Sequence, residues 1–329
     1  MKPKVSIIIV NFNGGEVFEN CLQSIKKLDY TNYETIVFDN GSRDGTQKYA
    51  SLKSKKNIGF VGGNNEALKI AKGKYILLLN NDTLVKKDLL DVMVNKMESD
   101  ETIGVIQPKI YLMDKKDYLD NAGSFWTNIG FLDHWGFNQK DSKEYDSERE
   151  IFSAKGACMM IRKDLIKKIG LFDEDYFAYF EESDFCFRVW IAGKRVVYFP
   201  KTSIQHKVGF TTKRSNVSFL NYLYYRNRIQ CLIKNLEVKD LISVLSAHFF
   251  VSLGIAFVFL IRGSIENFFL VMRAIKWNFV NLNATLKKRK NVQNYRVYKD
   301  EEIFARVGHK VNWSKFFGDF KRIEKDLAK

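Results

Sequence analysis

The chain has 329 residues, and its 46% hydrophobic share is enough for one large core or two smaller ones, which excludes a disordered chain. Its four cysteines lie far apart without a C-x-x-C pair, so the sequence predicts a reducing compartment and no disulfide scaffold. Of the net charge of +15, residues 207–329 carry +14, from 23 basic and 9 acidic side chains. This excess favours an anionic partner, either a membrane surface or a nucleic acid.

The first 110 residues alternate between strand and helix patterns. Residues 5–10 (VSIIIV) are continuous and β-branched, as in a strand covered on both faces, and they are too few for the core of a signal peptide. Apolar residues at helical spacing over 16–27 predict a helix, and residues 34–38 predict a strand that ends at Asp39. Continued to residue 110, the order β-α-β-α-α-β-α-β predicts a parallel sheet with crossover helices.

A glycine-rich loop opens a helix in this first part of the chain. In residues 57–65 (NIGFVGGNN), the glycines and the helix N-terminus would let backbone N–H groups approach a diphosphate closely. The loop is neither a G-x-G-x-x-G nor a Walker loop. A tight structural turn explains it about equally well.

The apolar run of residues 75–79 (YILLL) predicts a central strand, which ends in Asn80, Asn81 and Asp82. Because open α/β folds bind ligands at the carboxyl edge of their sheet, Asp82 is the anchor of the predicted site. The alternative is that residues 81–83 form a turn and an N-cap for a helix that starts near residue 85.

Periodicity is lost over residues 111–150, which we interpret as a long functional loop region. Residues 150–162 then predict a strand interrupted near its middle, and residues 163–169 a short helix. A further strand is predicted over 195–200, ahead of His206. A lone histidine is more often structural than a metal ligand, but its place after a strand makes His206 a candidate ligand.

A cluster of acids lies within residues 176–188 (YFAYFEESDFCFR). Glu181, Glu182 and Asp184 follow a run of aromatic side chains that would desolvate them and raise one pKa toward the range of a general base. The alternative is that these acids stabilise the N-terminus of the helix that runs to residue 192, where negative charge is favourable.

In this order and spacing, the motifs resemble the family 2 glycosyltransferases of the GT-A fold, in particular the rhamnosyltransferase-like members that build bacterial surface polysaccharides. The resemblance covers about residues 4–206. It rests on VSIIIVNFN (5–13), VFDNGSRDGT (37–46), NIGFVGGNNEAL (57–68), LLLNNDT (77–83), KGACMMIR (155–162) and FDEDYFAYFEESDFCFRV (172–189). It implies an α/β catalytic domain over residues 1–212, with a mostly parallel central sheet and flanking helices, that uses a nucleotide-diphospho-sugar donor.

The resemblance also implies a donor pocket. Asp39 matches the carboxylate that recognises the nucleotide base, and it would serve uracil or thymine equally, so a UDP-sugar and dTDP-rhamnose are both expected donors. The nucleotide-sugar-binding residues implied by the resemblance are Asn11, Asn13, Asp39, Asn57, Gly63, Asn64 and Asn81.

Asp82 matches the last acid of the family's D-x-D-type metal element and would bind Mg²⁺ or Mn²⁺, with His206 as a second ligand. A histidine ligand tilts this preference toward Mn²⁺. Asn80 stands where the family more usually has the first acid, and it is a further candidate ligand.

Glu182 occupies the second position of the family's E-D pair, where aspartate is more usual, and is the expected general base. Glu181 and Asp184 remain its competitors. The resemblance places a further group on the acceptor side or in positioning the carboxylates: Lys155, Gly156 and Arg188.

Residues 213–329 form a basic region that is expected to be helical. Within it, residues 241–261 carry no formal charge and are long enough to span a membrane. A single span would place residues 262–329, with 16 basic and 7 acidic side chains, opposite the catalytic domain, which the positive-inside rule disfavours. We therefore expect a helix or helical hairpin over 241–280 that lies in the inner leaflet, with Trp277 at the interface and residues 287–290 (KKRK) against anionic headgroups.

The sequence thus predicts an inverting, metal-dependent glycosyltransferase at the cytoplasmic face of the cell membrane, peripheral or monotopic, which transfers sugar to a glycan or lipid-linked acceptor. The departures at Asn80 and Glu182 keep an alternative open, a nucleotide-sugar-binding or glycan-binding protein of the same fold without turnover. No nucleic-acid partner is expected, because no recognisable binding module accompanies the basic charge.

Overall fold

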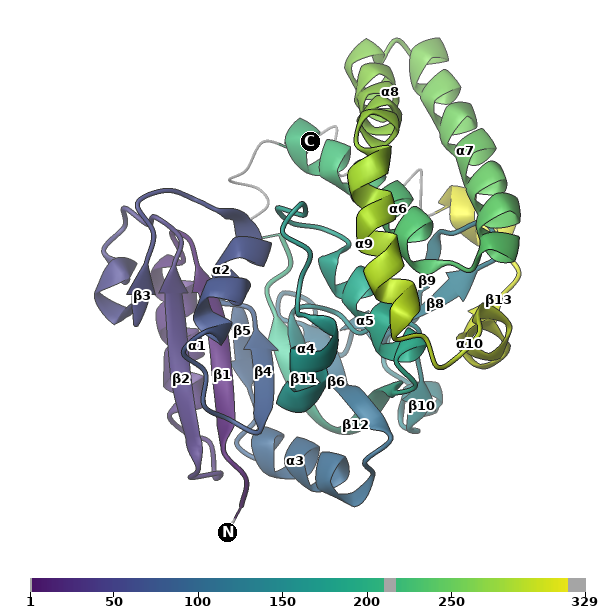
Figure 1. Ribbon diagram of the computed structural model, residues 1–329. Coiled ribbons are helices and arrows are strands. Elements are labelled where there is room, and N and C mark those ends of the chain that lie inside the picture. The colour runs from purple at the N-terminus through teal and green to yellow at the C-terminus, as the bar shows by residue number, and fades with distance from the viewer. Residues whose placement is uncertain (1, 210–216, 319–329) are drawn as a thin grey trace.

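The computed structural model describes residues 2–209 and 217–318, and its centre is a large sheet with helices on both faces (Figure 1). The sheet order is β10-β12-β6-β11-β4-β1-β2-β3, with β5 paired to β12 and β7 paired to β6. The strands are β1 (Val5–Asn11), β2 (Tyr33–Asp39), β3 (Leu52–Lys53), β4 (Tyr75–Leu79), β5 (Thr83–Val85), β6 (Ile103–Leu112), β7 (Leu119–Asn121), β8 (Ser124–Thr127), β9 (Leu132–His134), β10 (Arg149–Glu150), β11 (Cys158–Arg162), β12 (Arg195–His206) and β13 (Gly308–His309).

The helices follow the strands that they cover. They are α1 (Gly15–Ile25), α2 (Gly59–Leu68), α3 (Leu89–Ser99), α4 (Lys163–Ile169), α5 (Glu181–Ile191), α6 (Val217–Asn235), α7 (Val238–Ile261), α8 (Ile265–Val280), α9 (Leu282–Asn294) and α10 (Asp300–Val307), with the 3₁₀ turns η1 (Thr46–Tyr49) and η2 (Lys143–Tyr145).

The predicted α/β class and mostly parallel sheet are confirmed. Strands β3, β2, β1, β4, β6 and β12 all run in one direction, and β11 is inserted antiparallel between β4 and β6. The apolar runs explain this centre, since β4 is buried along its whole length and β1 at every position but one. Because the strands are parallel, their carboxyl ends meet along one edge of the sheet.

Three predictions about elements were wrong. The region 111–150 is not a loop, because it holds the short strands β7, β8, β9 and β10; β8 pairs with the neighbouring β9 and with the distant β13. Residues 83–85 pair as β5 with β12 instead of leading into a helix, and α3 starts four residues later. The strand predicted over 150–162 is two strands, β10 and β11, at different places in the sheet.

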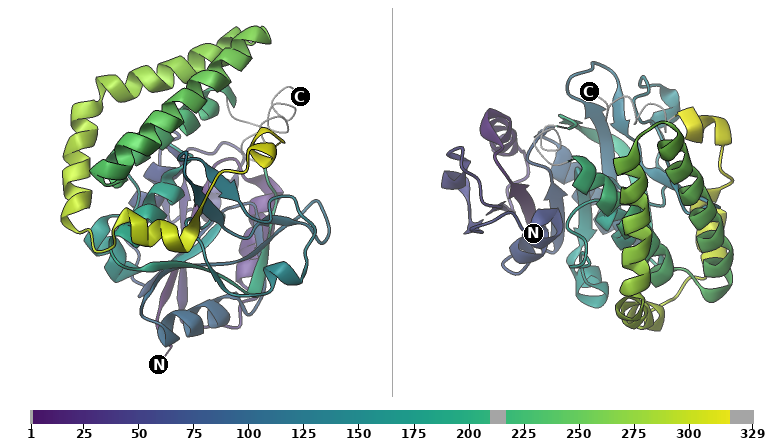
Figure 2. Two further views of the ribbon diagram at one scale, coloured as in Figure 1. Left: turned by 90° about the vertical axis from the view of Figure 1, so that its right-hand side faces the viewer. Right: turned by 90° about the horizontal axis from the view of Figure 1, so that it is seen from above.

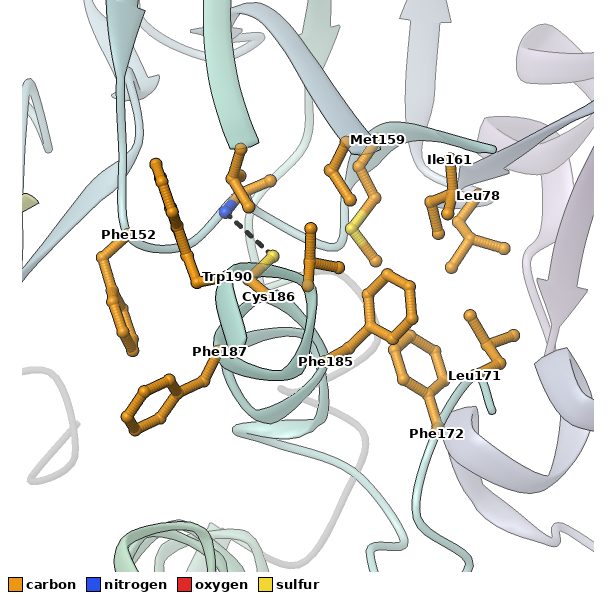
Figure 3. Packing of buried hydrophobic residues seen from close by; sticks show 14 of the residues in the cluster. Leu78, Phe152, Met159, Ile161, Leu171, Phe172, Phe185, Cys186, Phe187 and Trp190 are labelled. Atoms are coloured by element: carbon orange, nitrogen blue, oxygen red, sulfur yellow. Dashed lines mark hydrogen bonds between the residues drawn. The ribbon is translucent and has the colours of Figure 1, made fainter. Parts of the chain in front are cut away.

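Helix α5 packs its aromatic face into the main hydrophobic core. Phe185, Phe187 and Trp190 are fully buried there, and Figure 3 shows Phe185 directed toward Met159 of β11 and Phe172. The Cys186 thiol accepts a hydrogen bond from the backbone N–H of Ala154 at 3.4 Å. These contacts fix the position of the N-terminal end of α5, where the acid cluster lies.

The C-terminal helices pack on the sheet and its flanking helices and share one core with them. Leu232 of α6 and Val307 of α10 belong to the same buried cluster as Phe187 of α5. Figure 2 shows α7 and α8 side by side as a hairpin at one side of the molecule. The predicted boundary at residue 212 lies outside the described residues.

Helix α7 is long and apolar enough to cross a membrane, and one third of its most apolar stretch is buried within the protein. Its inner face contacts the loop between β8 and β9, since the His248 ring lies 4.5 Å from the Phe131 ring and His248 Nδ1 lies 3.1 Å from the Ile129 carbonyl oxygen. Its outer face exposes large apolar side chains, including Phe250 and Phe257. The helix therefore has one face for protein and one for an apolar environment.

If the two regions share one core, a cavity in the shared part destabilises the whole chain. Leu232→Ala should lower the free energy of unfolding by about 2–5 kcal/mol in one transition, because the side chain is fully buried. The exposed Leu286→Ala should change it by less than about 0.5 kcal/mol. Urea unfolding followed by tryptophan fluorescence measures both, and a separate early transition for the C-terminal helices would contradict the shared core.

Candidate active site

The carboxyl ends of β1, β2 and β4 carry the polar side chains that the sequence predicts there. Asn11 and Asp39 are register neighbours at the ends of β1 and β2. The Asn81 side-chain amide donates to Asn11 Oδ1 at 2.9 Å, and the Asn11 amide donates to Thr46 Oγ1 at 2.8 Å. Asn81 and Asn11 thus hold the strand ends together.

A cleft of about 340 Å³ opens beside these strand ends. Segments that are far apart in the chain meet in its walls: the ends of β1 and β4, the loop before β11, the start of α5 and the end of β12. Its lining includes most of the predicted site residues, namely Asn57, Asn80, Asn81, Asp82, Lys155, Gly156, Glu181, Glu182 and His206.

Asp82 and His206 face each other on one side of this cleft. His206 Nε2 lies 3.2 Å from Asp82 Oδ1, a buried oxygen that has no hydrogen-bond partner within the described part of the chain. His206 Nδ1 lies 2.8 Å from a carboxylate oxygen of the fully buried Asp120 on β7. Burial alone would lower the pKa of His206, but its contacts with Asp120 and Asp82 raise it to about 9.

This arrangement fits a divalent cation. The buried Asp82 oxygen and the neutral imidazole nitrogen of His206 are a suitable pair of ligands for Mg²⁺ or Mn²⁺, and a bound cation would take the place of the proton that His206 otherwise holds. A second carboxylate on the far ring nitrogen is the usual orienting partner of a metal-bound histidine, and Asp120 occupies that position. The Asn80 side chain lies beside this pair, with its amide nitrogen 3.4 Å from His206 Nε2, and its amide oxygen is the atom suited to a hard cation.

Glu181 and Glu182 begin helix α5 and also line the cleft. One carboxylate oxygen of each, Oε2, is buried and has no hydrogen-bond partner among residues 2–209 and 217–318. Burial, followed by repulsion from Glu182, raises the pKa of Glu181 well above its ordinary value, and burial raises the pKa of Glu182. Neither side chain caps the helix; the N-cap is Phe180.

The backbone ahead of this pair is strained. Tyr179 and Phe180 have φ values of 67° and 70°, a region that non-glycine residues rarely adopt. The strain is held by Asn227 of α6, whose side-chain amide donates to the carbonyl oxygens of Ala178 and Tyr179 at 3.0 and 2.7 Å. Helix α6 therefore helps to fix the direction in which α5 presents its glutamates.

Asp184 and Arg188 lie on another side of α5, away from the cleft. The Arg188 Nε donates to Asp184 Oδ2 at 2.9 Å, and Lys234 Nζ lies 2.9 Å from Asp184 Oδ1. Despite burial, the charges of Lys234 and Arg188 lower the pKa of Asp184. Asp184 is thus a saturated structural acid, and Arg188 positions this carboxylate and does not line the acceptor side.

The residues predicted to bind the donor also differ in whether they line the cleft. Asn57 lines the cleft and its Oδ1 accepts from the Asn40 amide at 2.9 Å. Asp39 lies behind Asn40, where its Oδ2 accepts from the Ser42 N–H at 3.1 Å and its buried Oδ1 has no partner among the residues described. Asn13 is bound into the same turn through its backbone N–H, which donates to Ser42 Oγ at 2.9 Å.

Gly63 and Asn64 lie inside helix α2 and not in the cleft. A Cβ at Gly63 would come within 2.8 Å of the Val10 side chain, so glycine is needed there for close packing of α2 on β1. The amide of Asn64 donates to the Phe60 carbonyl at 2.9 Å. Both residues act on the site through the packing of this helix.

Sequence reasoning missed two residues of the site. Asp120 joins His206 to Lys155, whose Nζ lies 3.0 Å from Asp120 Oδ1, but it falls in the stretch without periodicity. Gly59 lines the cleft at φ +83°, and a Cβ there would lie 2.3 Å from the Phe177 carbonyl oxygen. Gly59 belongs to the glycine-rich loop 57–65 that the sequence indicates as a phosphate-binding candidate, but the residue singled out there was Gly63, which does not line the cleft.

Comparison with known proteins agrees with the fold. The family model for glycosyl transferase family 2 matches residues 6–170. A low-salt glycan biosynthesis hexosyltransferase of Haloferax volcanii is 26% identical over 69% of this chain and 75% of its own. An N-acetylglucosaminyl-diphospho-decaprenol L-rhamnosyltransferase of Mycobacterium tuberculosis is 22% identical over 67% of this chain and 81% of its own.

Solved structures show the same fold at low identity. S. aureus TarS 1–349 in complex with UDP-GlcNAc superposes with a TM-score of 0.59 at 17% identity, over 89% of this chain and 90% of that chain. A Pyrobaculum calidifontis mannosyltransferase with GDP-Man and Mn²⁺ gives a TM-score of 0.52 at 16% identity, over 90% and 86%.

The fold is that of a GT-A-like glycosyltransferase, an enzyme of the hexosyltransferase class. The chain belongs to glycosyl transferase family 2.

The two kinds of acid at the start of α5 should respond oppositely to neutralisation. Asp184→Asn should destabilise the chain by about 3 kcal/mol or more, because it breaks a buried ion network. At alkaline pH, Glu182→Gln should not lower the free energy of unfolding and should even raise it. The raised pKa means that the folded wild type holds its proton more tightly than the unfolded chain, so wild-type stability falls as pH rises through that pKa, whereas glutamine does not ionise.

Urea unfolding of both variants at neutral and alkaline pH measures this difference. A loss of stability in Glu182→Gln as large as that in Asp184→Asn would contradict the separation of the two acids.

Proposed function

We propose that this enzyme transfers a hexosyl group from a nucleoside-diphosphate sugar to an acceptor hydroxyl with inversion of the anomeric configuration. The observation that carries the proposal is that two pairs, Asp82–His206 and Glu181–Glu182, line one cleft. Each pair has a buried carboxylate oxygen without a hydrogen-bond partner among the described residues. Metal-assisted displacement of a diphosphate needs a cation site and a base in a common space. A protein that only binds the sugar nucleotide would need no general base, and so no Glu181–Glu182 pair in its cleft.

The donor end of the cleft supports binding of a nucleoside diphosphate and a cation. Asp82 and His206, with Asn80 beside them, would hold Mg²⁺ or Mn²⁺, and the histidine favours Mn²⁺. A bound cation would offset the charge that develops on the departing diphosphate. Asp39 and Asn57 would contact the nucleoside, and a UDP-sugar or dTDP-rhamnose is the donor that we propose.

At the acceptor end, Glu182 is the proposed general base. The acceptor hydroxyl oxygen forms a bond to the anomeric carbon while the bond from that carbon to the diphosphate oxygen breaks, and the hydroxyl proton passes to the Glu182 carboxylate. Burial raises the pKa of Glu182, which makes its carboxylate a stronger base, and the same holds for Glu181, which remains its competitor. Asp184 is excluded because both of its oxygens are bound within the protein.

Helices α7 and α8 are proposed to hold the enzyme on the cytoplasmic face of the membrane as a monotopic protein, near a glycan or lipid-linked acceptor. Support comes from the exposed apolar face of the hairpin and from the packing of α7 on the catalytic domain, which a free spanning helix would lack. The basic run 287–290 contributes less than its sequence suggests. Lys288 Nζ lies 2.6 Å from Asp175 Oδ2, and the Arg289 guanidinium donates to the Ile233 carbonyl at 2.7 Å.

Transfer assays test the two pairs directly. Asp82→Ala and Glu182→Gln should each reduce transfer of radiolabelled sugar by at least about 100-fold, since cation binding and general-base catalysis are each worth that much. Glu66→Gln, which removes an exposed carboxylate from α2, is the control and should keep wild-type transfer. Donor binding without transfer to any acceptor in the wild type would instead favour a binding protein without turnover.

A further inference from the structure

A second cavity of about 150 Å³ lies between the C-terminal helices and the β8–β9 hairpin. Its walls are mostly aromatic and aliphatic, and they come from β8–β9, α6, α7, α8 and the segment 311–316. The lining residues used below are Phe131, Asn221, Tyr224, Arg228, Phe259 and Asn267. We call it the second cavity.

Arg228 lines the second cavity, and within residues 2–209 and 217–318 its guanidinium is in no ion pair with an acidic side chain. The side chain is 0% exposed, and none of its three nitrogens has a hydrogen-bond partner among the described residues. Its neighbours are ring faces, with Phe131 and Tyr224 centroids at 4.2 and 4.0 Å. Asp133 is the acidic residue in the lining of the cavity, and it already has other partners. Its carboxylate lies 3.1 Å from His309 Nε2 and is also paired with Lys315.

Aromatic faces alone do not compensate a fully buried positive charge. A cation–π contact is worth less than the cost of burying an unpaired ion, and buried charges in proteins are normally paired. A guanidinium has five N–H donors in a geometry that matches a phosphate, and Arg228 is a lining residue of this cavity. A volume of about 150 Å³ suits one small group of roughly the size of benzene, and so a head group and not a glycan.

The second cavity lies between the cleft and the exposed apolar surface. Leu220 of α6 lines the cleft, and the next residue, Asn221, lines the second cavity. The Tyr224 ring meets the ring of Tyr179, a cleft residue, at 6.5 Å. On the other side, Phe259 lies near the turn of the α7–α8 hairpin.

Large apolar side chains are exposed around that turn. They are Phe257 at 60%, Ile261 at 69%, Ile265 at 56% and Phe269 at 51%. Such an apolar surface next to a buried cationic cavity fits a ligand with a long apolar chain and an anionic head.

We propose that the second cavity binds the phosphate group of a long-chain lipid phosphate, with Arg228 as its ion-pair partner and the lipid chain along the exposed face of α7 and α8. Bound in this way, the part of the lipid beyond its phosphate would extend past Tyr224 and Tyr179 toward Glu182. That this lipid is the sugar acceptor rests on the proposed function, whereas the binding itself does not.

Binding of n-decyl phosphate below its micelle concentration to the full chain tests the proposal by calorimetry. Wild type should bind it, inorganic phosphate should bind far more weakly, and decanol should not reproduce the affinity. Arg228→Met should weaken decyl phosphate binding by roughly 10- to 100-fold, the loss expected for a charge-assisted hydrogen bond. Arg273→Met removes an exposed charge from α8 and should leave the affinity within about twofold.

If Arg228 served only to stabilise the fold, Arg228→Met would melt at a lower temperature than wild type. The proposal predicts instead that, without ligand, Arg228→Met melts no lower than wild type, because the substitution removes an unpaired buried charge. Equal binding of decanol and decyl phosphate to wild type, or equal binding of inorganic phosphate, would overturn the proposal whether or not the variant folds. So would unchanged affinity in a folded Arg228→Met.

Failure here and failure of the proposed function give different results. A wild type that transfers sugar to an acceptor but does not bind decyl phosphate would overturn this inference alone. A wild type that binds decyl phosphate through Arg228 but transfers no sugar would overturn the proposed function alone. Arg228→Met should still bind the nucleotide-sugar donor, because Arg228 does not line the cleft.

Discussion

The buried carboxylate of Asp120 is the constraint on which the cleft depends. One of its oxygens lies 2.8 Å from His206 Nδ1 and the other 3.0 Å from Lys155 Nζ, so it ties the end of β12 to the loop before β11. Burial raises the pKa of Asp120, but Lys155 and His206 together lower it, to about 2. Asp120 therefore stays ionised and keeps the free nitrogen of His206 directed at Asp82, which is how a carboxylate orients a metal-binding histidine.

The acids at the start of helix α5 lie within one turn of one another but have different surroundings. Glu181 and Glu182 line the cleft without partners, whereas Asp184 is buried among the cations Arg188 and Lys234. Lys234 comes from α6, so the C-terminal helices hold the helix that presents the proposed base. The same helices form the proposed membrane surface and the second cavity. Helix α6 therefore lies between the proposed membrane surface and the helix that carries Glu181 and Glu182, and it contacts both.

Much of the sheet and part of the site could be predicted from the sequence, and the reason is local. Buried parallel strands read as continuous apolar runs, so β1 and β4 were clear, and Asp82 follows from the end of β4. The short strands of residues 111–150 could not be predicted, because two to four residues are too few to show a periodic pattern, and Asp120 of β7 was missed with them. The roles of Gly63 and Arg188 depend on packing against other elements, which no local pattern shows.

The central claim is that Asp82 and His206, held by Asp120, form a cation-dependent site for a nucleoside-diphosphate sugar. A thermal-shift panel of UDP-, dTDP- and GDP-sugars with and without Mn²⁺ tests it most directly, since a ligand that binds the folded state raises the melting temperature. The account predicts that a UDP- or dTDP-sugar raises the melting temperature in the presence of Mn²⁺ and much less in its absence. No shift with any of these sugars, or a shift that is the same without the metal, would contradict it.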